Sequence, residues 1–244
     1  KYADTAMQLG RYDRAEQGYQ QALEAMEIED VLPFEIDYAK RKKAQARVRG
    51  LCEPWYAERD KLSGTEKAQA VLNKMNEVNP DRPDAEASPW RYQVQRGRLV
   101  AMTLENGAFT QFLEPLKGLL LRELTFSNCP RLADLTSLKG MAIGSLTLND
   151  CTALEDLEPL KGMPLAELVL RNCPQLDDLS PLEGIPLTSL VIEGCGNIAD
   201  ISLLKDMPLE RLEIDSLGAK NLDVLHGMPL KQLKLGRMAP DEPA

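Results

Sequence analysis

The sequence DLEPLKGMPLAELVLRNCPQLDDLSPLEGIPL, residues 156–187, contains one pattern twice at a spacing of 22 residues. The same pattern recurs on both sides of this stretch, in six full units and a shortened seventh. The units begin at Leu99, Leu121, Ile143, Leu165, Leu187, Leu209 and Leu230, the last after 21 residues. A fixed period in this range indicates a repeat architecture in which each unit packs on the next.

The apolar residues inside one unit predict its local structure. In the unit that begins at Leu165, apolar residues stand at positions 1, 4, 6, 9, 12, 15 and 18. Positions 4 and 6 alternate as in a strand, whereas the later positions are three residues apart, as in a 3₁₀ or turn-like segment. Parallel stacking of such units buries a continuous leucine core with strands about 4.8 Å apart.

The patterns L-x-x-L-x-L-x-x-C and D-L-x-P-L-K-G-M-P-L resemble the leucine-rich-repeat family, and most of all its 22-residue bacterial units of the internalin type. The resemblance covers residues 97–236 and departs from the family at position 9, where Cys replaces the usual Asn. It implies a curved solenoid with a parallel β-sheet on its concave face, and a role in protein binding.

Two further side-chain ladders follow the same period. One consists of Cys129, Cys151, Cys173 and Cys195, and the other of Asp134, Asp156, Asp178 and Asp200. Metal binding is the alternative for both, but ligands must converge on one point, and these residues are spread along a stack. We therefore expect buried cysteines and aspartates that cap free N–H groups, with no metal or other cofactor.

Residues 1–78 have a helical period and resemble the tetratricopeptide repeat in ADTAMQLGRYDRAEQGYQQAL, through small and aromatic residues. The residues of that resemblance are Ala3, Gly10, Tyr12, Ala15, Tyr19 and Ala22. Ala68, Leu72 and Met75 resemble the second helix of another copy. Gly50 and Pro54 predict a break or kink in the helix between them.

The predicted fold is therefore α+β, a tetratricopeptide-like helical domain followed by a leucine-rich-repeat solenoid. We place the helical domain at 1–78, a Pro-rich linker and N-terminal cap at 79–96, the repeats at 97–236 and a polar tail at 237–244. Because the chain starts with Lys1 and not with Met, we expect it to be a piece of a longer product, from which a signal or anchor could have been removed.

Composition excludes several classes of function. The net charge is −9 and aromatic residues make up 5% of the chain, which disfavours nucleic-acid binding. No apolar run is long enough to span a membrane. The single histidine, His226, has no nucleophile motif beside it, and phosphate-loop and metalloprotease motifs are absent, so we predict no enzymatic activity. The odd number of cysteines, five, favours a reducing compartment such as the cytoplasm, but localisation is otherwise undetermined.

Positions 3, 5 and 7 of each unit point away from the leucine core and are free to specify a partner. The predicted partner-binding residues are Thr103, Glu123, Thr125, Ser145, Thr147, Asn149, Glu167, Val169, Arg171, Ser189, Val191, Glu193, Arg211, Glu213, Asp215 and Lys234. Residues 97–244 contain 13 basic and 21 acidic residues, which favours a basic protein partner. The alternative is that this face binds no partner and that its residues only favour strand formation and solubility.

Two other functions fit the same sequence. Pairs of helical and leucine-rich repeats are similar to recognition or docking regions of larger bacterial signalling proteins, such as serine/threonine protein kinases. The last strand has no obvious cap after it, so a structural protein that forms homo-oligomers through its open C-terminal sheet edge is the second alternative. The identity of the partner and the oligomeric state stay open at this stage.

Overall fold

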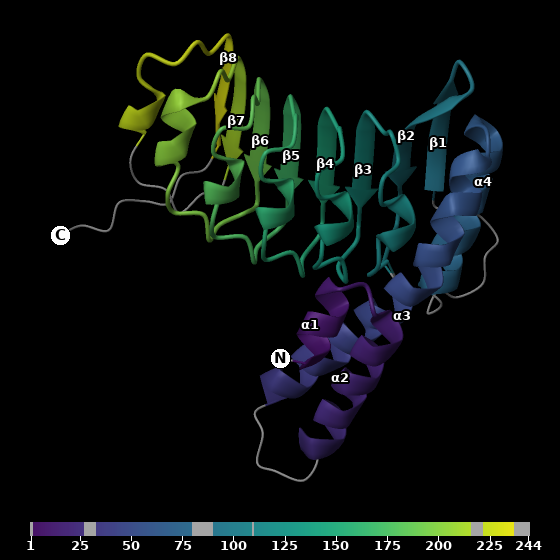
Figure 1. The fold of residues 1–244 in the computed structure, drawn as a ribbon. Coiled ribbons are helices and arrows are strands. Elements are labelled where there is room, and N and C mark those ends of the chain that lie inside the picture. The colour runs from purple at the N-terminus through teal and green to yellow at the C-terminus, as the bar shows by residue number, and fades with distance from the viewer. Residues whose placement is uncertain (1, 27–32, 80–89, 109, 216–221, 237–244) are drawn as a thin grey trace. The chain divides into compact units, whose positions relative to one another are not determined.

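A computed structural model describes residues 2–26, 33–79, 90–108, 110–215 and 222–236. The chain forms two compact units, Lys1–Leu62 and Ser63–Ala244. The first unit contains α1 (Tyr2–Gln8), α2 (Tyr12–Met26) and α3 (Pro33–Lys61), and the second contains α4 (Gly64–Val78) and an eight-stranded sheet (Figure 1). The predicted combination of an N-terminal helical segment and a repeat solenoid is confirmed.

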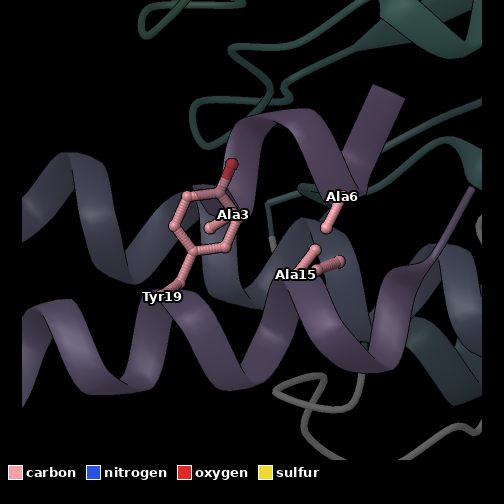
Figure 2. Close-up of a cluster of buried hydrophobic side chains, with 5 residues drawn as sticks. Ala3, Ala6, Ala15 and Tyr19 are labelled. Atoms are coloured by element: carbon pink, nitrogen blue, oxygen red, sulfur yellow. The ribbon is translucent and has the colours of Figure 1, made fainter. Parts of the chain in front are cut away.

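Small side chains let the helices of the first unit approach closely. Ala3 and Ala6 of α1, Ala15 and Tyr19 of α2, and Ala46 of α3 form its buried cluster (Figure 2). The Tyr19 hydroxyl donates a 2.6 Å hydrogen bond to Asp4 Oδ1, and this bond is the main reason that the pKa of Asp4 lies below its ordinary value. The small residues of this pattern thus lie where the helices pack.

Of the predicted break or kink at Gly50 and Pro54, the break is wrong, because α3 runs through both residues. Pro54 is exposed, and it removes one backbone donor from the helix. A Cβ on Gly50 would lie 3.4 Å from Tyr12 Cβ, so Gly50 marks a close approach of α2 to α3. Packing against α2 stabilises the helix beyond what its local propensity predicts.

The sheet of the second unit follows chain order from β1 to β8. Its strands are β1 (Trp90–Gln95), β2 (Arg98–Leu104), β3 (Glu123–Ser127), β4 (Ser145–Asn149), β5 (Glu167–Arg171), β6 (Ser189–Glu193), β7 (Arg211–Asp215) and β8 (Gln232–Leu235). β1 is antiparallel to β2, and every later pair is parallel. Each residue pairs with its equivalent in the next unit, so the repeat sets the register.

Short 3₁₀ turns return the chain from one strand to the next, as the three-residue spacing predicted. They are η1 (Glu114–Leu116), η2 (Thr136–Leu138), η3 (Glu158–Leu160), η4 (Ser180–Leu182), η5 (Ser202–Asp206) and η6 (Asp223–Leu225). The ladder aspartates accept the N–H of the residue two positions on, at 2.6 Å in Asp156 and 2.7 Å in Asp178. The predicted capping of these return segments is confirmed.

The core consists of columns that run through the stack. The position 4 column runs from Leu124 to Leu212, and the position 6 column runs from Phe126 to Ile214. Every side chain in these two columns is at most 1% exposed. The four ladder cysteines are fully buried, as predicted, and their thiols donate to backbone carbonyls; that of Cys173 lies 3.4 Å from the Arg171 oxygen. Leu217, which takes the place of Cys in the sixth unit, lies outside the described residues.

The residue before each ladder cysteine, and before Gly107 at the equivalent place in the first unit, makes the turn sharp. Asn106, Asn128, Asp150, Asn172 and Gly194 all have φ between 50° and 65° at equivalent positions. Asn, Asp and Gly tolerate this left-handed conformation best, so residue type and backbone agree in five consecutive units.

The N-terminal end of the core is covered within the second unit. Trp90 of β1 is buried and lies edge to face against Phe126, at 6.1 Å between ring centroids. α4 packs on β1, β2 and η1, and its Ala68, Leu72 and Met75 are buried. Of the predicted linker, residues 80–89 lie outside the described part, as does the predicted tail 237–244.

Asn79 fastens the end of α4 to the first return segment. Its buried amide donates to the carbonyl oxygens of Met75 and Phe112, and its Oδ1 accepts the N–H groups of Gln111 and Phe112. Contacts therefore group α4 with the sheet, while the helical-domain boundary that we place at residue 78 stays a prediction.

Candidate interaction surface on the sheet

The parallel register gathers the predicted partner-binding residues into three columns on the sheet face opposite the leucine core, here called the outer face. Position 3 contributes Ala101, Glu123, Ser145, Glu167, Ser189, Arg211 and Gln232. Position 5 contributes Thr103, Thr125, Thr147, Val169, Val191, Glu213 and Lys234. Position 7 contributes Ser127, Asn149, Arg171, Glu193 and Asp215. Sequence positions 22 residues apart thus become neighbours in space.

The half of the outer face nearer β2 is mostly neutral and rich in hydroxyl groups. Thr103, Thr125 and Thr147 are half-buried and adjacent in one column. Asn149 donates to the Ser127 hydroxyl at 3.4 Å. Its Oδ1 has no hydrogen-bond partner and is the one such buried side-chain oxygen or nitrogen among the described residues.

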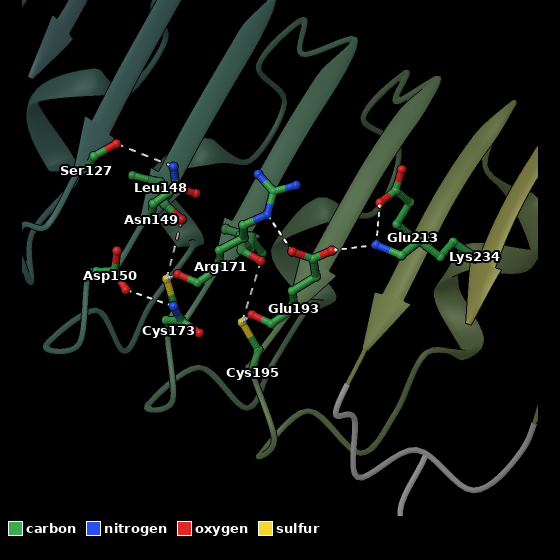
Figure 3. A network of polar contacts seen from close by, with 12 residues as sticks. Ser127, Leu148, Asn149, Asp150, Arg171, Cys173, Glu193, Cys195, Glu213 and Lys234 are labelled. Carbon is green, nitrogen blue, oxygen red and sulfur yellow. Dashed lines mark hydrogen bonds and ion pairs between the residues drawn. The ribbon is translucent and has the colours of Figure 1, made fainter. Parts of the chain in front are cut away.

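The half nearer β8 carries a connected ionic network (Figure 3). Arg171 Nε donates to Glu193 Oε2 at 2.5 Å, across the β5–β6 pair. Arg211 donates from Nε and Nη2 to Glu213 Oε1, at 3.0 and 2.6 Å. Lys234 Nζ lies 3.3 Å from Glu193 and 3.4 Å from Glu213, and so links the two pairs.

These contacts hold the groups in their charged forms. The pKa of Glu193 is lowered chiefly by its hydrogen bond from Arg171, and the pKa of Glu213 chiefly by its bond from Arg211. The pKa of Lys234 is raised, first by Glu193 and then by Glu213. Fixed charges of both signs are therefore present on this half at neutral pH.

Exposure differs among the predicted residues. Val191 is 1% exposed and Glu213 is 6% exposed, so their side chains offer little area to a partner. Glu123, Glu167 and Arg211 are well exposed, and the remaining members of the predicted set lie between these extremes or, like Lys234, face solvent. A strand-alternation pattern predicts direction but not how far neighbouring side chains cover each other.

Other kinds of site find little support in the described part of the chain. His226 is exposed at the end of η6. No group of three or more His, Cys, Asp or Glu residues within the described ranges has an arrangement that could hold a metal ion. A search of the described helices for one long and apolar enough to cross a bilayer finds none.

A cluster of arginines at the start of the sheet escapes the repeat-based analysis. Arg96, Arg98 and Arg122 line one cleft with Gln95 and Val100. They occupy different positions of the pattern, so no period connects them in the sequence. The only sequence signal is their local density in an acidic chain, and the β1–β2 hairpin brings them together.

No protein-family model matches the chain, and no curated protein does. Among solved structures, it is similar to internalin C2 from Listeria monocytogenes, with 19% identity over 68% of this chain and 92% of that one and a TM-score of 0.39. It is also similar to an internalin, inlF, from Listeria monocytogenes, with 22% identity over 52% of each chain and a TM-score of 0.31. The 22-residue repeat, the parallel register and the buried columns of the chain itself define a leucine-rich-repeat solenoid.

Proposed function

We propose that the chain is a non-enzymatic binding module that holds a protein partner on the outer face of its sheet. The observation that carries the proposal is the alignment of side chains not used by the core into three in-register columns, two across seven strands and one across five. Neighbouring members of a column are about 4.8 Å apart, which suits simultaneous contacts with an extended or flat partner.

The rigidity of this face supports binding. Each strand from β2 to β7 is fixed by hydrogen bonds to both neighbours, and Arg171, Glu193 and Lys234 are already held by one another. Side chains that are ordered before association lose less entropy when a partner arrives. The described outer face has no Trp or Tyr, so we expect binding energy to come from polar and ionic contacts.

The charge balance of the face supports a basic partner. Its predicted residues include the five carboxylates Glu123, Glu167, Glu193, Glu213 and Asp215, against the three cations Arg171, Arg211 and Lys234. Glu193 and Glu213 are engaged with cations. Exposed Glu123 and Glu167 therefore carry the surplus negative charge, and complementary charge raises the rate and selectivity of encounter.

The test compares binding by three forms of the chain. One combines Glu213→Lys with Lys234→Glu, and another combines Thr125→Arg with Thr147→Arg, so that both halves of the outer face are altered. The control exchanges the exposed pair Glu210 and Lys231, which lies 2.8 Å apart at position 2 and off the outer face. Partners cross-linked to the wild-type chain are identified by mass spectrometry.

We expect the control to retain the partner and the outer-face variants to lose it, with circular dichroism unchanged in all three. Retention by both outer-face variants would show that the partner uses another surface.

If the chain is the recognition region of a larger bacterial signalling protein, such as a serine/threonine kinase, it would use the same face for recognition. The mass of the native product, measured with an antibody against this chain, separates this arrangement from a stand-alone adaptor.

A second candidate function is self-assembly through β8, and a specific observation supports it. Leu233 and Leu235 continue the core columns of Leu212 and Ile214, yet they are 47% and 40% exposed. β8 pairs with β7, and no described strand lies on its other side. An exposed apolar edge of this kind is a template for another strand.

Light scattering tests this candidate directly. Under self-assembly, the wild-type chain is dimeric or larger, and Leu235→Lys converts it to a monomer because a charge at the edge opposes strand pairing. The outer-face variants stay assembled. A monomeric wild type at concentrations of about 100 μM, where a stable interface is populated, rejects self-assembly.

A further inference from the structure

An open cleft of about 580 Å³ lies at the N-terminal end of the sheet, lined by Gln95, Arg96, Arg98, Val100 and Arg122. All five residues belong to the compact unit Ser63–Ala244. A cleft of this size falls in the range of small-molecule sites. It is separate from the residues of the outer-face proposal.

The hairpin and the strand register build the cleft. Gln95 pairs with Arg98 across the antiparallel β1–β2 ladder, and Arg122 N–H donates to the Val100 carbonyl at 2.7 Å on the other side of β2. Gln93 and Val94 of β1 pair with Ala101 and Leu99, so Val100 is the extra residue of a β-bulge in β2. Arg96 stands in the hairpin turn with φ of 50°, next to Gly97 with φ of 72°.

The turn is fixed in place by α4. Gly64 N–H donates to the Gly97 carbonyl at 2.9 Å, and a Cβ on Gly64 would lie 2.6 Å from Val94 Cγ1. The N-terminus of α4 therefore lies against the residue between Arg96 and Arg98, and its dipole adds positive potential there. The acidic residue of that first turn, Glu66, accepts hydrogen bonds from Ser63.

The charge of the cleft is unbalanced. No carboxylate lines it, and within the described ranges none of its three arginines forms an ion pair. Elsewhere in the same unit, arginines do have acidic partners: Arg91 pairs with Glu105 at 3.1 Å, and Arg171 and Arg211 pair with glutamates of the outer face. Three guanidinium groups gathered without a counter-charge favour an anionic ligand.

We propose that this arginine cleft binds a phosphate monoester group. A guanidinium presents paired N–H donors that match the oxygens of phosphate. A phosphate monoester carries a charge between −1 and −2 at neutral pH and three acceptor oxygens, so one group can engage all three arginines. A carboxylate has two oxygens and one charge, and leaves the third arginine unmatched.

The experiment measures binding of phenyl phosphate and benzoate to the full chain by calorimetry or by amide chemical shifts. The two probes share a ring and differ in the anionic group. Arg98→Gln and Arg122→Gln are made singly and together, and the control is Lys139→Gln with Lys205→Gln, which removes the same charge from exposed residues of the return segments. Circular dichroism checks the fold of every variant.

Phenyl phosphate is expected to bind the wild type and the control equally, and to lose about tenfold in affinity for each arginine removed. Benzoate is expected to bind more weakly. The Arg98→Lys and Arg122→Lys double variant keeps the charge but lacks the paired donors, and should recover only part of the affinity. Variants of the outer face leave phosphate binding unchanged.

A phosphoserine peptide serves as a third probe and identifies the source of the group. A peptide that binds tighter than phenyl phosphate shows that a phosphorylated chain is the ligand, whereas equal affinity shows that the site takes small phosphate esters. No binding of any phosphate probe overturns the proposal. So does equal binding of benzoate, or unchanged affinity in the double Arg→Gln variant.

Discussion

Lys234 on β8 lies 3.3 Å from Glu193 on β6, two strands away and 41 residues earlier in the sequence. Its ammonium group also lies 3.4 Å from Glu213 on the strand between them. One cation therefore connects carboxylates from two successive units, and Arg171 extends the network to a fourth strand. This arrangement is specific to the C-terminal units, because the earlier units carry Thr or Val at position 5.

Removal of Arg171 should raise the pKa of Glu193. The hydrogen bond from Arg171 is the main cause of the lowered pKa, and Lys234 contributes less. We expect Arg171→Gln to move the pKa further toward the ordinary value of 4.5 than Lys234→Gln does. Carboxyl NMR titration measures both shifts, and equal shifts in the two variants would contradict the assigned order.

The lowered pKa values of Glu193 and Glu213 also determine how the stability of the fold changes with pH. A carboxylate whose pKa is lower in the folded state stabilises the fold above its unfolded pKa, and this stabilisation is lost as the pH falls through the folded pKa. For Glu193 and Glu213 the loss begins below about pH 4.5. Urea unfolding as a function of pH should therefore show less acid sensitivity in Arg171→Gln than in the wild type.

Gly194→Ala should destabilise the solenoid by about 1–2 kcal/mol, the cost of a left-handed backbone in a residue with a Cβ. Gly194 has φ of 65°, and an added Cβ would lie 2.4 Å from Asn172 Oδ1. Gly144→Ala is the matched control, because its Cβ would lie 3.6 Å from the Arg122 carbonyl and its φ lies outside that region. Equal unfolding free energies for the two variants would argue against strain at Gly194.

The ladder cysteines should not react with thiol reagents in the folded chain. The pKa of Cys173 is raised to about 12, first by its interaction with Cys151 and then by burial. The thiolate is the form that reacts, so the raised pKa and the full burial of the side chain both oppose labelling at pH 8. Labelling should reach all five cysteines in urea and stay near zero without it, and rapid labelling of the native chain would refute the prediction.

Asp178→Ala should lower the urea midpoint of the solenoid. Asp178 accepts hydrogen bonds from the Ser180 hydroxyl at 2.6 Å and the Ser180 N–H at 2.7 Å, and these bonds lower its pKa. Removal of the carboxylate leaves the N–H at the start of η4 without its capping partner. Glu183→Ala, an exposed change at the end of the same turn, is the control and should leave the midpoint unchanged.

Much of the second unit could be predicted because a repeat multiplies a weak signal. One strand of five residues, such as Glu167–Arg171, is ambiguous by itself, but the same alternation in every unit identifies both the strand and its inward face. The Cys and Asp ladders follow from the same period. Their burial and capping depend only on neighbours that the repeat itself specifies.

The candidate sites could be predicted only in part. Alternation placed Val191 and Glu213 on the outer face, but the extent of their burial depends on the size and pairing of the side chains around them. The pairing of Lys234 with Glu193 depends on how far a lysine extends across two strands. The arginine cleft depends on β1 and on the turn to β2, and β1 lies outside the repeat.

The sequence by itself determined the repeat, the strand register and the inward columns, because each of these is set by local residue type and a constant spacing. Only the tertiary structure decided that α3 continues through Pro54, that α4 packs with the sheet, and that Arg96, Arg98 and Arg122 share a cleft. These features arise from contacts between segments of different pattern. The stability of each feature depends on which residues pack against it, and no single repeat period in the sequence specifies those residues.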